Sequence, residues 1–253
     1  AWQGDGFFYS TYSQENQFAE TRNQKVMYHK LGTEQSEDQL IFERKNNPSA
    51  TFSFITTSDE RFFVLTETNH TAKIVNIYII YYESETPVIK CLISNLHDNV
   101  NILDHHNGKF IATTSKESNN GMIIEIDPAN PYKWKAIVSE YNDGLLLEVI
   151  PFKDRIVTIY QANQHPILMV YDYFGTALYS LEFPMVSSVS GFSGESTDEE
   201  MLFDFESYTI PPVVFSFNIR TFERKLTKKT VVSFDFESIV YEEVEFMSSD
   251  STM

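Results

Sequence analysis

The chain has 253 residues, of which 42% are hydrophobic and 15% aromatic, and its 36 acidic residues against 19 basic ones give a formal charge of -17. This composition supports a large folded core, and the acidic balance argues against nucleic acid or an anionic membrane surface as a partner. The single Cys91 excludes an internal disulfide framework or a thiolate zinc cluster, and no apolar run approaches the roughly 20 residues that span a bilayer. We expect a soluble protein, of the cytoplasm or the periplasm.

The residue types favour strands over helices. The chain contains 21 Phe and 14 Tyr, which are enriched in β-strands together with Val, Ile and Thr. Its apolar runs are short and are separated by turn residues, as at Asp5-Gly6, Asn107-Gly108 and Pro128–Pro131. No stretch of about a dozen residues has a convincing helical period. The sequence therefore predicts an all-β protein.

One element recurs along the chain, namely a turn followed by a basic or polar residue and an apolar strand, which we call the marker turn. Its copies are Asp5–Tyr9, Ser58–Leu65, Asn107–Ala112, Lys153–Thr158 and Asp198–Phe203. From the second copy onward the spacing is about 46–48 residues, which lies within the roughly 40–50 residues of a WD40 or kelch blade. The repeat predicts a β-propeller.

Further strands complete each predicted unit. A hairpin follows each marker turn, at Val26–Leu31 with Gln39–Glu43, Ile74–Tyr82 with Val88–Ile93, Met122–Ile126 with Trp134–Val138, Ile167–Tyr171 with Ala177–Phe183, and Val213–Phe217 with Phe222–Leu226. An apolar strand precedes the later turns, at Ala50–Ile55, Val100–Leu103, Leu145–Pro151 and Val186–Phe192. We therefore expect five four-stranded antiparallel blades, with the innermost strand of the first missing before Trp2.

Strand alternation also predicts which side chains form the core. The expected buried residues are Phe63, Leu65, Ile77, Ile79, Ile111, Ile124, Val157, Ile159, Met169 and Phe215.

No residue pattern predicts an active site, a metal site or a cofactor. His105 and His106 stand next to each other, and adjacent residues of an extended chain point to opposite faces, so we expect a solvated turn rather than a chelating pair. Ser193 resembles a nucleophile elbow only superficially, because Glu195 replaces the last glycine of Gly-x-Ser-x-Gly. We expect Ser193 to lie in a turn between the first two strands of the last blade.

Several segments closely resemble the prolyl oligopeptidase family. In that family a blade reads Tyr-Tyr-His-Lys-Leu-Gly-Thr-x-Gln-Ser-Glu-Asp, and Met27–Asp38 matches it with Glu20-Thr21 and Asn23 upstream. Similar motifs are Trp2–Tyr9, Ser188–Gly194, Ser207–Pro211 and Val244–Thr252, in the last of which Ser251 replaces a glycine.

The resemblance implies a role as well as a fold. The family consists of serine peptidases that cleave short peptides after proline, with the Ser, Asp and His triad on an α/β-hydrolase domain that follows a seven-bladed propeller. Residues 1–243 then resemble the last five blades, and residues 244–253 the strand that leads into the catalytic domain. The implied partners are that domain and short proline-containing peptides, and the chain itself has no catalytic residue.

The resemblance also supplies candidate site residues. Ser13–Gln24 matches the mobile loop at the domain interface, so Ser13, Glu20, Thr21 and Asn23 are gating-loop candidates, although an ordinary solvated connection explains this loop equally well. Thr113–Asn120 aligns with a family loop near the outer substrate subsites, which makes Ser115, Lys116 and Asn120 candidates for substrate contact. Lys116 keeps the charge of the family's arginine without its planar fork.

Two other functions compete with a gating propeller. One is a free-standing propeller that binds a basic protein partner through its acidic surface, and the other is an enzyme with a site inside the propeller itself. Five blades taken from a seven-bladed ring also leave two end faces, which we expect to be apolar. We therefore expect self-association through those faces or a tightened five-bladed closure.

Overall fold

The computed structural model describes residues 1–12, 23–83, 88–183, 186–233, 238–242, 244 and 247. Within them, the strands form five four-stranded antiparallel sheets, and in each sheet successive strands are neighbours. The helical content of these described residues is one 3-10 turn, η1 (Gln35–Glu37). None of the described helices is long and apolar enough to cross a membrane.

The strands follow the chain from one sheet to the next. The first sheet contains β1 (Trp2–Gln3), β2 (Gly6–Tyr12), β3 (Gln24–Lys30) and β4 (Gln39–Glu43). The second contains β5 (Thr51–Thr56), β6 (Phe62–Asn69), β7 (Ile74–Tyr81) and β8 (Lys90–Leu96). The third contains β9 (Val100–His106), β10 (Lys109–Thr114), β11 (Met122–Ile126) and β12 (Trp134–Val138). The fourth contains β13 (Leu145–Pro151), β14 (Ile156–Ala162), β15 (His165–Tyr171) and β16 (Ala177–Glu182). The fifth contains β17 (Ser187–Ser193), β18 (Glu200–Ser207), β19 (Val213–Asn218) and β20 (Arg224–Lys229).

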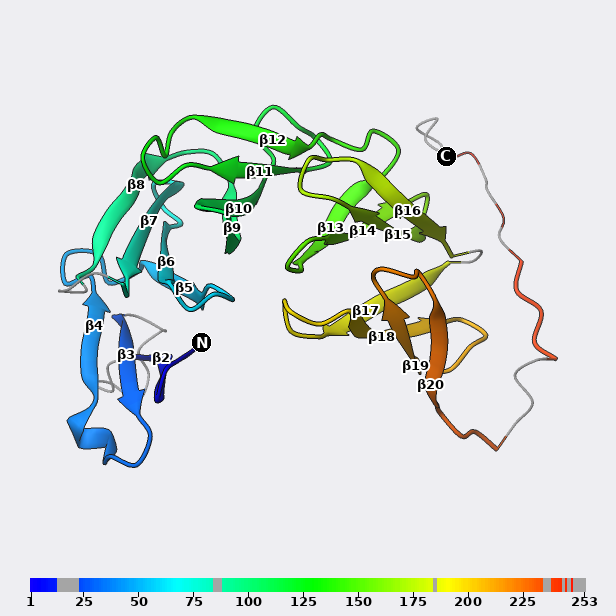
Figure 1. Cartoon of the computed structure of the whole chain (residues 1–253), viewed down its shortest axis with the longest axis horizontal. Helices are drawn as coiled ribbons and strands as arrows, with labels where there is room; N and C mark the ends of the chain where they lie inside the picture. Colours follow the sequence, from blue (N-terminus) through cyan, green and yellow to red (C-terminus); the bar gives the residue numbers. More distant parts are fainter. Residues whose placement is uncertain are drawn as a thin grey trace.

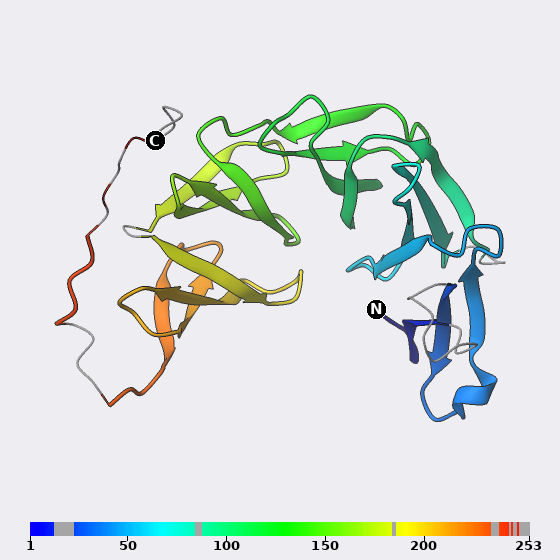
Figure 2. The same cartoon turned by 180° about the vertical axis from the view of Figure 1, so that it is seen from behind.

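The five sheets are arranged as the blades of an open arc (Figure 1), and the view from behind shows the same opening between the first and last sheets (Figure 2). The predicted all-β propeller is confirmed, and the expected tightened closure is not found. The innermost strand of the first blade, expected to be missing, is present as the two-residue strand β1, in which Trp2 pairs with Phe7 and Gln3 with Gly6.

The core lies between successive sheets. Each junction between neighbouring sheets holds its own cluster of buried apolar side chains, and these clusters join the five blades into one body. In the inner blades, the strand that is second in its sheet is therefore buried on both faces. The segments Phe62–Leu65 of β6 and Ile156–Tyr160 of β14 show this. In the last blade β18 alternates instead: Met201, Phe203 and Phe205 are buried and their neighbours exposed, because only one face of that sheet is covered.

The predicted core is largely confirmed. The buried members are Phe63, Leu65, Ile77, Ile111, Ile124, Val157 and Ile159. Ile79, Met169 and Phe215 are only partly buried. All three belong to third strands, on which Ile77 and Ile124 are nevertheless fully buried.

The two end faces of the arc differ in chemistry. The open face of the first sheet is aromatic and apolar: Phe7 lies 5.2 Å from both the Trp2 ring and the His29 ring, and Leu40 is exposed beside Met27. The open face of the last sheet is polar and charged, with carboxylates on β18 and lysines on β20. Its exposed side chains on β18 are Glu200, Leu202, Asp204 and Glu206. The expectation of two apolar end faces is therefore wrong for the last blade, since strand alternation there puts carboxylates outward.

Candidate functional site

A cavity of about 490 Å³ lies between the third and fourth blades, at the end of the sheets where β10 runs into β11. Its lining consists of side-chain amides, hydroxyls and leucines, with one carboxylate. The lining residues are Asn99, Asn101, Leu103, Thr113, Thr114, Ser115, Asn119, Asn120, Gly121, Leu145, Leu146, Leu147, Glu148 and Val149. Ser115 and Asn120, two of the sequence-predicted site residues, are among them.

The loop of residues 115–121, which joins β10 to β11, is fixed by hydrogen bonds at its start. The buried Thr114 donates through Oγ1 to the carbonyl of Asn99 at 2.6 Å and accepts from the backbone N–H of Lys116 at 3.1 Å. The N–H of Ser118 donates to the carbonyl of Ser115 at 3.2 Å. Glu117, at φ +55°, turns the chain between them. The loop is therefore a formed wall of the cavity.

Asn120 ties this loop to the next blade. Its backbone N–H donates to Glu140 Oε1 at 2.7 Å, and its side-chain N–H groups donate to the carbonyls of Tyr141 and Asn142 at 3.2 and 3.1 Å. Its own carbonyl accepts from the N–H of Leu146 at 2.8 Å. Asn120 thus shapes the cavity by joining its two walls, and its amide donors are already engaged.

Lys116, the third sequence-predicted residue of this loop, does not line the cavity. Its Nζ lies 2.9 Å from Asp98 Oδ2 and 4.9 Å from the centre of the Trp134 ring. Neither partner lines the cavity. The ammonium group of Lys116 therefore makes an ion pair and a cation–π contact outside the cavity. The structure brings Ser115 and Asn120 together and separates Lys116 from them.

The opposite wall comes from β13, the innermost strand of the fourth blade. Leu146 pairs with Tyr160 and Glu148 with Ile159, so Leu147 is an extra residue, a β-bulge. Leu147 and Glu148 are consequently both exposed at the cavity, and partial burial raises the pKa of Glu148. Neither residue was predicted from the sequence, and the signal that could have drawn attention to them is an acidic residue directly after three consecutive leucines, Leu145–Leu147.

Of the gating-loop candidates, the structure describes only Asn23. Ser13, Glu20 and Thr21 fall outside the described residues. Asn23 is described: it has a φ of +57°, and its N–H donates to the carbonyl of Pro48 at 2.8 Å. Asn23 lies at the same end of the sheets as residues 115–121, because each directly adjoins the start of the third strand of its sheet.

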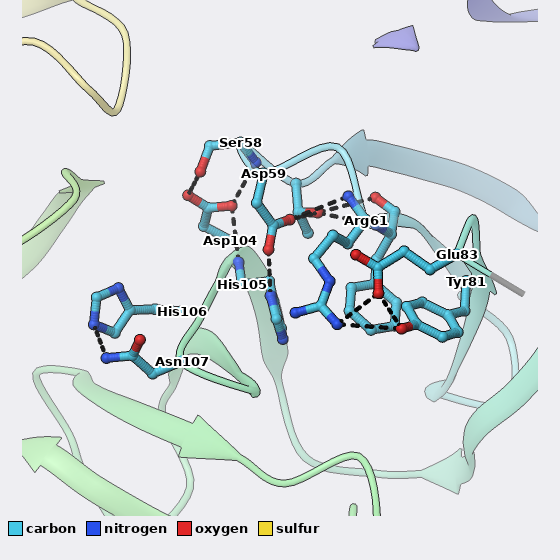
Figure 3. Close-up of polar contacts among 11 residues, drawn as sticks. Ser58, Asp59, Arg61, Tyr81, Glu83, Asp104, His105, His106 and Asn107 are labelled. Atoms are coloured by element: carbon cyan, nitrogen blue, oxygen red, sulfur yellow. Dashed lines mark hydrogen bonds and ion pairs between the residues drawn. The ribbon is translucent and has the colours of Figure 1, made fainter. Parts of the chain in front are cut away.

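The other end of the sheets carries a polar cluster, which we call the marker-turn cluster: Ser58, Asp59, Asp104 and His105 (Figure 3). Asp104 accepts from the N–H and the hydroxyl of Ser58 at 2.7 and 2.6 Å and from the N–H of His105 at 2.8 Å. His105 Nδ1 lies 2.6 Å from Asp59 Oδ2. These contacts join the second blade to the third.

The side chains of His105 and His106 point away from each other, as expected (Figure 3). The prediction of a solvated turn, however, is wrong for His105. Its side chain is buried, because Asp59 from the preceding blade receives it. His106 stacks on Tyr173 of the fourth blade with ring centres 3.6 Å apart, and burial lowers its pKa. Among the described residues, no group of three or more His, Cys, Asp or Glu side chains is placed to hold a metal ion.

The sequence predicted that Ser193 lies in a turn, whereas the structure shows it as the last residue of β17. It pairs with Leu202 on β18 across a bulge that follows Ser190. A residue held within a sheet differs from the strand-to-helix turn of a nucleophile elbow, so the geometry gives Ser193 no such role.

Comparison with known proteins identifies relatives over the whole arc. The family model described as "Prolyl oligopeptidase, N-terminal beta-propeller domain" matches residues 1–230. The prolyl endopeptidase of Elizabethkingia meningoseptica is 30% identical over 259 residues, which cover 100% of this chain and 36% of the relative. Protease 2 of Moraxella lacunata is 25% identical, over 92% of this chain and 33% of the relative.

Solved structures agree on the fold. Prolyl oligopeptidase B of Galerina marginata, bound to a 35mer hydrolysis and macrocyclization substrate, has a TM-score of 0.86 with this chain at 19% identity, and the match covers 98% of this chain and 36% of that one. The chain thus spans about a third of the length of the relatives that it matches. The family match over residues 1–230, which end one residue after β20, shows that this chain belongs to the prolyl oligopeptidase family, as its N-terminal β-propeller domain.

Proposed function

We propose that this chain is the substrate-filtering propeller of a serine endopeptidase that cleaves short peptides after proline, and that it contacts the peptide in the cavity between the third and fourth blades. The observation that carries the proposal is the cavity itself, walled by residues 115–121 on one side and by β13 on the other. Residues 244–253 would lead from the propeller into an α/β-hydrolase domain.

The lining of the cavity suits an extended peptide. Side-chain amides of Asn99, Asn101 and Asn119 and the hydroxyl of Thr113 offer donors and acceptors that match a peptide backbone of any sequence. An unfolded peptide presents those backbone groups, whereas a folded protein has already paired most of its own. This difference supports a filter that admits flexible peptides and rejects globular chains.

A titration of the isotopically labelled chain tests this proposal by NMR. A proline-containing hexapeptide should shift the side-chain amide signals of Asn101 and Asn119, and a folded protein that carries the same six residues within a strand should not. The labelled chain alone should not cleave a chromogenic proline peptide. Absence of any shift at these asparagines at millimolar peptide would contradict peptide contact in the cavity.

The aromatic end face of the first blade supports a second part of the proposal. Trp2 is 66% exposed and Leu40 49% exposed on a face whose neighbours Phe7 and Met27 are apolar. Large exposed apolar patches usually have a partner. We propose that, in the isolated chain, a second copy of the chain binds this end face. The chain would then self-associate through its first blade and not through its last.

Light scattering of a Leu40→Ser variant tests this association. The parent chain should gain mass as its concentration rises, and the variant should remain closer to the mass of one chain. Leu202→Ser on the polar and charged end face of the last sheet is the matched control and should behave as the parent. Equal masses for the parent and both variants at every concentration would rule out association through the first blade.

A further inference from the structure

The bulge in β13 leaves two neighbouring side chains exposed at the cavity, and one of them carries a charge. Successive residues of a regular strand point to opposite faces, yet Leu147 and Glu148 are both exposed, because Leu147 has no partner of its own on β14. Bulges commonly re-aim a side chain beside a functional site. Leu147 and Glu148 both lie opposite Ile159, and both line the cavity.

Glu148 is the one ionisable side chain among the described residues that line this cavity. Within the described part of the chain it has no hydrogen bond and no ion pair. Lys116, the cation of the loop that walls the cavity, is held by Asp98 at 2.9 Å and is not among the lining residues.

Partial burial without a partner disfavours the charged form of a carboxyl group, and it is the cause that raises the pKa of Glu148. A cation that enters the cavity would relieve this penalty. The overall charge of the chain, -17, attracts cations to all of its surfaces, and in this cavity a single carboxylate lies among neutral amides and hydroxyls.

We propose that Glu148 binds the positively charged group of a peptide, either a Lys or Arg side chain or the N-terminal ammonium, and so makes the propeller favour basic peptides. This inference rests on the proposed function, since it names the class of peptide that the same cavity takes. Leu103 and Leu147 lie in the same cavity, and the aliphatic stem of a Lys or Arg side chain packs on such leucines while its charged end reaches the carboxylate.

Leu103 strengthens the argument because it arises in the same way. On β9, Asp104 pairs with Ile111 and Ile102 with Ala112, which leaves Leu103 as the extra residue of a second bulge. The innermost strands of two neighbouring blades thus each place a bulged leucine in one cavity, beside Glu148. An apolar surface next to an unpaired carboxylate is complementary to a long basic side chain.

Two pairs of peptides test the inference on the intact chain, with dissociation constants measured by NMR titration. The first pair is an acetylated proline-containing hexapeptide with Lys at one position and the same peptide with norleucine there. The second pair is the norleucine peptide with a free and with an acetylated N-terminus. We expect about three- to tenfold tighter binding for the charged member of at least one pair, and which pair shows it identifies the source of the cation.

The variant Glu148→Gln removes the charge and keeps the shape. It should abolish the preference and leave the affinity for the uncharged peptide unchanged. Glu182→Gln, on the exposed outer strand β16, removes one negative charge just as Glu148→Gln does and should leave the preference intact. High salt should weaken the preference in the parent chain.

The outcomes separate this inference from the proposed function. If all peptides bind in the cavity with equal affinity, or if Glu148→Gln keeps the preference, the role of Glu148 is overturned and the peptide-binding propeller stands. If Glu182→Gln removes the preference as well, the cause is the general charge of the chain, and the inference is again overturned. If no peptide binds, peptide contact and the inference both fail.

Discussion

Two carboxylates on the innermost strands of neighbouring blades have opposite surroundings. Asp104, on β9, is buried and accepts three hydrogen bonds from the backbone and side chain of Ser58 and the backbone of His105. Glu148, on β13, is exposed to a cavity, with no partner among the described residues. A buried carboxylate is stable only when donors surround it, so the first is a structural element. The second is free to bind a ligand.

The position of each carboxylate along its strand explains this difference. Asp104 stands near the end of β9 next to the marker turn of the preceding blade, where the backbone N–H of Ser58 donates to this carboxylate. Glu148 stands within β13, where the amide groups of β14 are already used in the sheet. The end of a strand therefore offers donors that the middle lacks.

The largest expected effect comes from Asp104→Ala. Its loss removes the acceptor of the N–H of the buried His105 and of the N–H and hydroxyl of Ser58, and we expect the free energy of unfolding to fall by about 2–4 kcal/mol. Urea denaturation measures this change. Glu148→Ala is the matched control and should stay within about 0.5 kcal/mol of the parent. Equal losses for both variants would abolish the distinction between the two carboxylates.

A smaller effect is expected for Asp59→Asn, and it depends on pH. Burial alone would raise the pKa of Asp59, but hydrogen bonds from Thr57 and His105 outweigh it and hold the pKa below the ordinary value of 3.8. A carboxyl group with a lowered native pKa stabilises the fold above its unfolded pKa, and this contribution disappears as the pH falls through the native pKa.

The measurement for Asp59 is the difference in unfolding free energy between the parent and Asp59→Asn across pH 2–7. The difference should be constant from about pH 5 upward, at about 1 kcal/mol or less since Asp59 is one-third exposed, and should shrink below about pH 4. A difference that grows as the pH falls would show that the carboxylate of Asp59 destabilises the fold.

The sequence predicted those features that depend on local pattern. The strands Met122–Ile126, Trp134–Val138 and Leu145–Pro151 have the expected bounds, since turn residues flank each of them and apolar residues fill them. The burial of His105 could not be predicted in this way, because its partner Asp59 comes from the preceding blade. The exposure of Glu148 depends on a bulge, which arises from pairing with β14 rather than from any local signal.

The smallest expected effect concerns Lys116, which the family resemblance proposed as a substrate contact and the structure places elsewhere. Its ammonium pairs with Asp98 and lies over the Trp134 ring, and exposed contacts of this kind contribute about 0.5–1 kcal/mol at most. Lys116→Met should therefore leave the peptide dissociation constant within about twofold of the parent. It should also alter the fluorescence of Trp134, because a cation leaves the face of that ring. A fall in peptide affinity as large as that of Glu148→Gln, with unchanged Trp134 emission, would return Lys116 to the binding site and show that the loop reaches the peptide in a different arrangement.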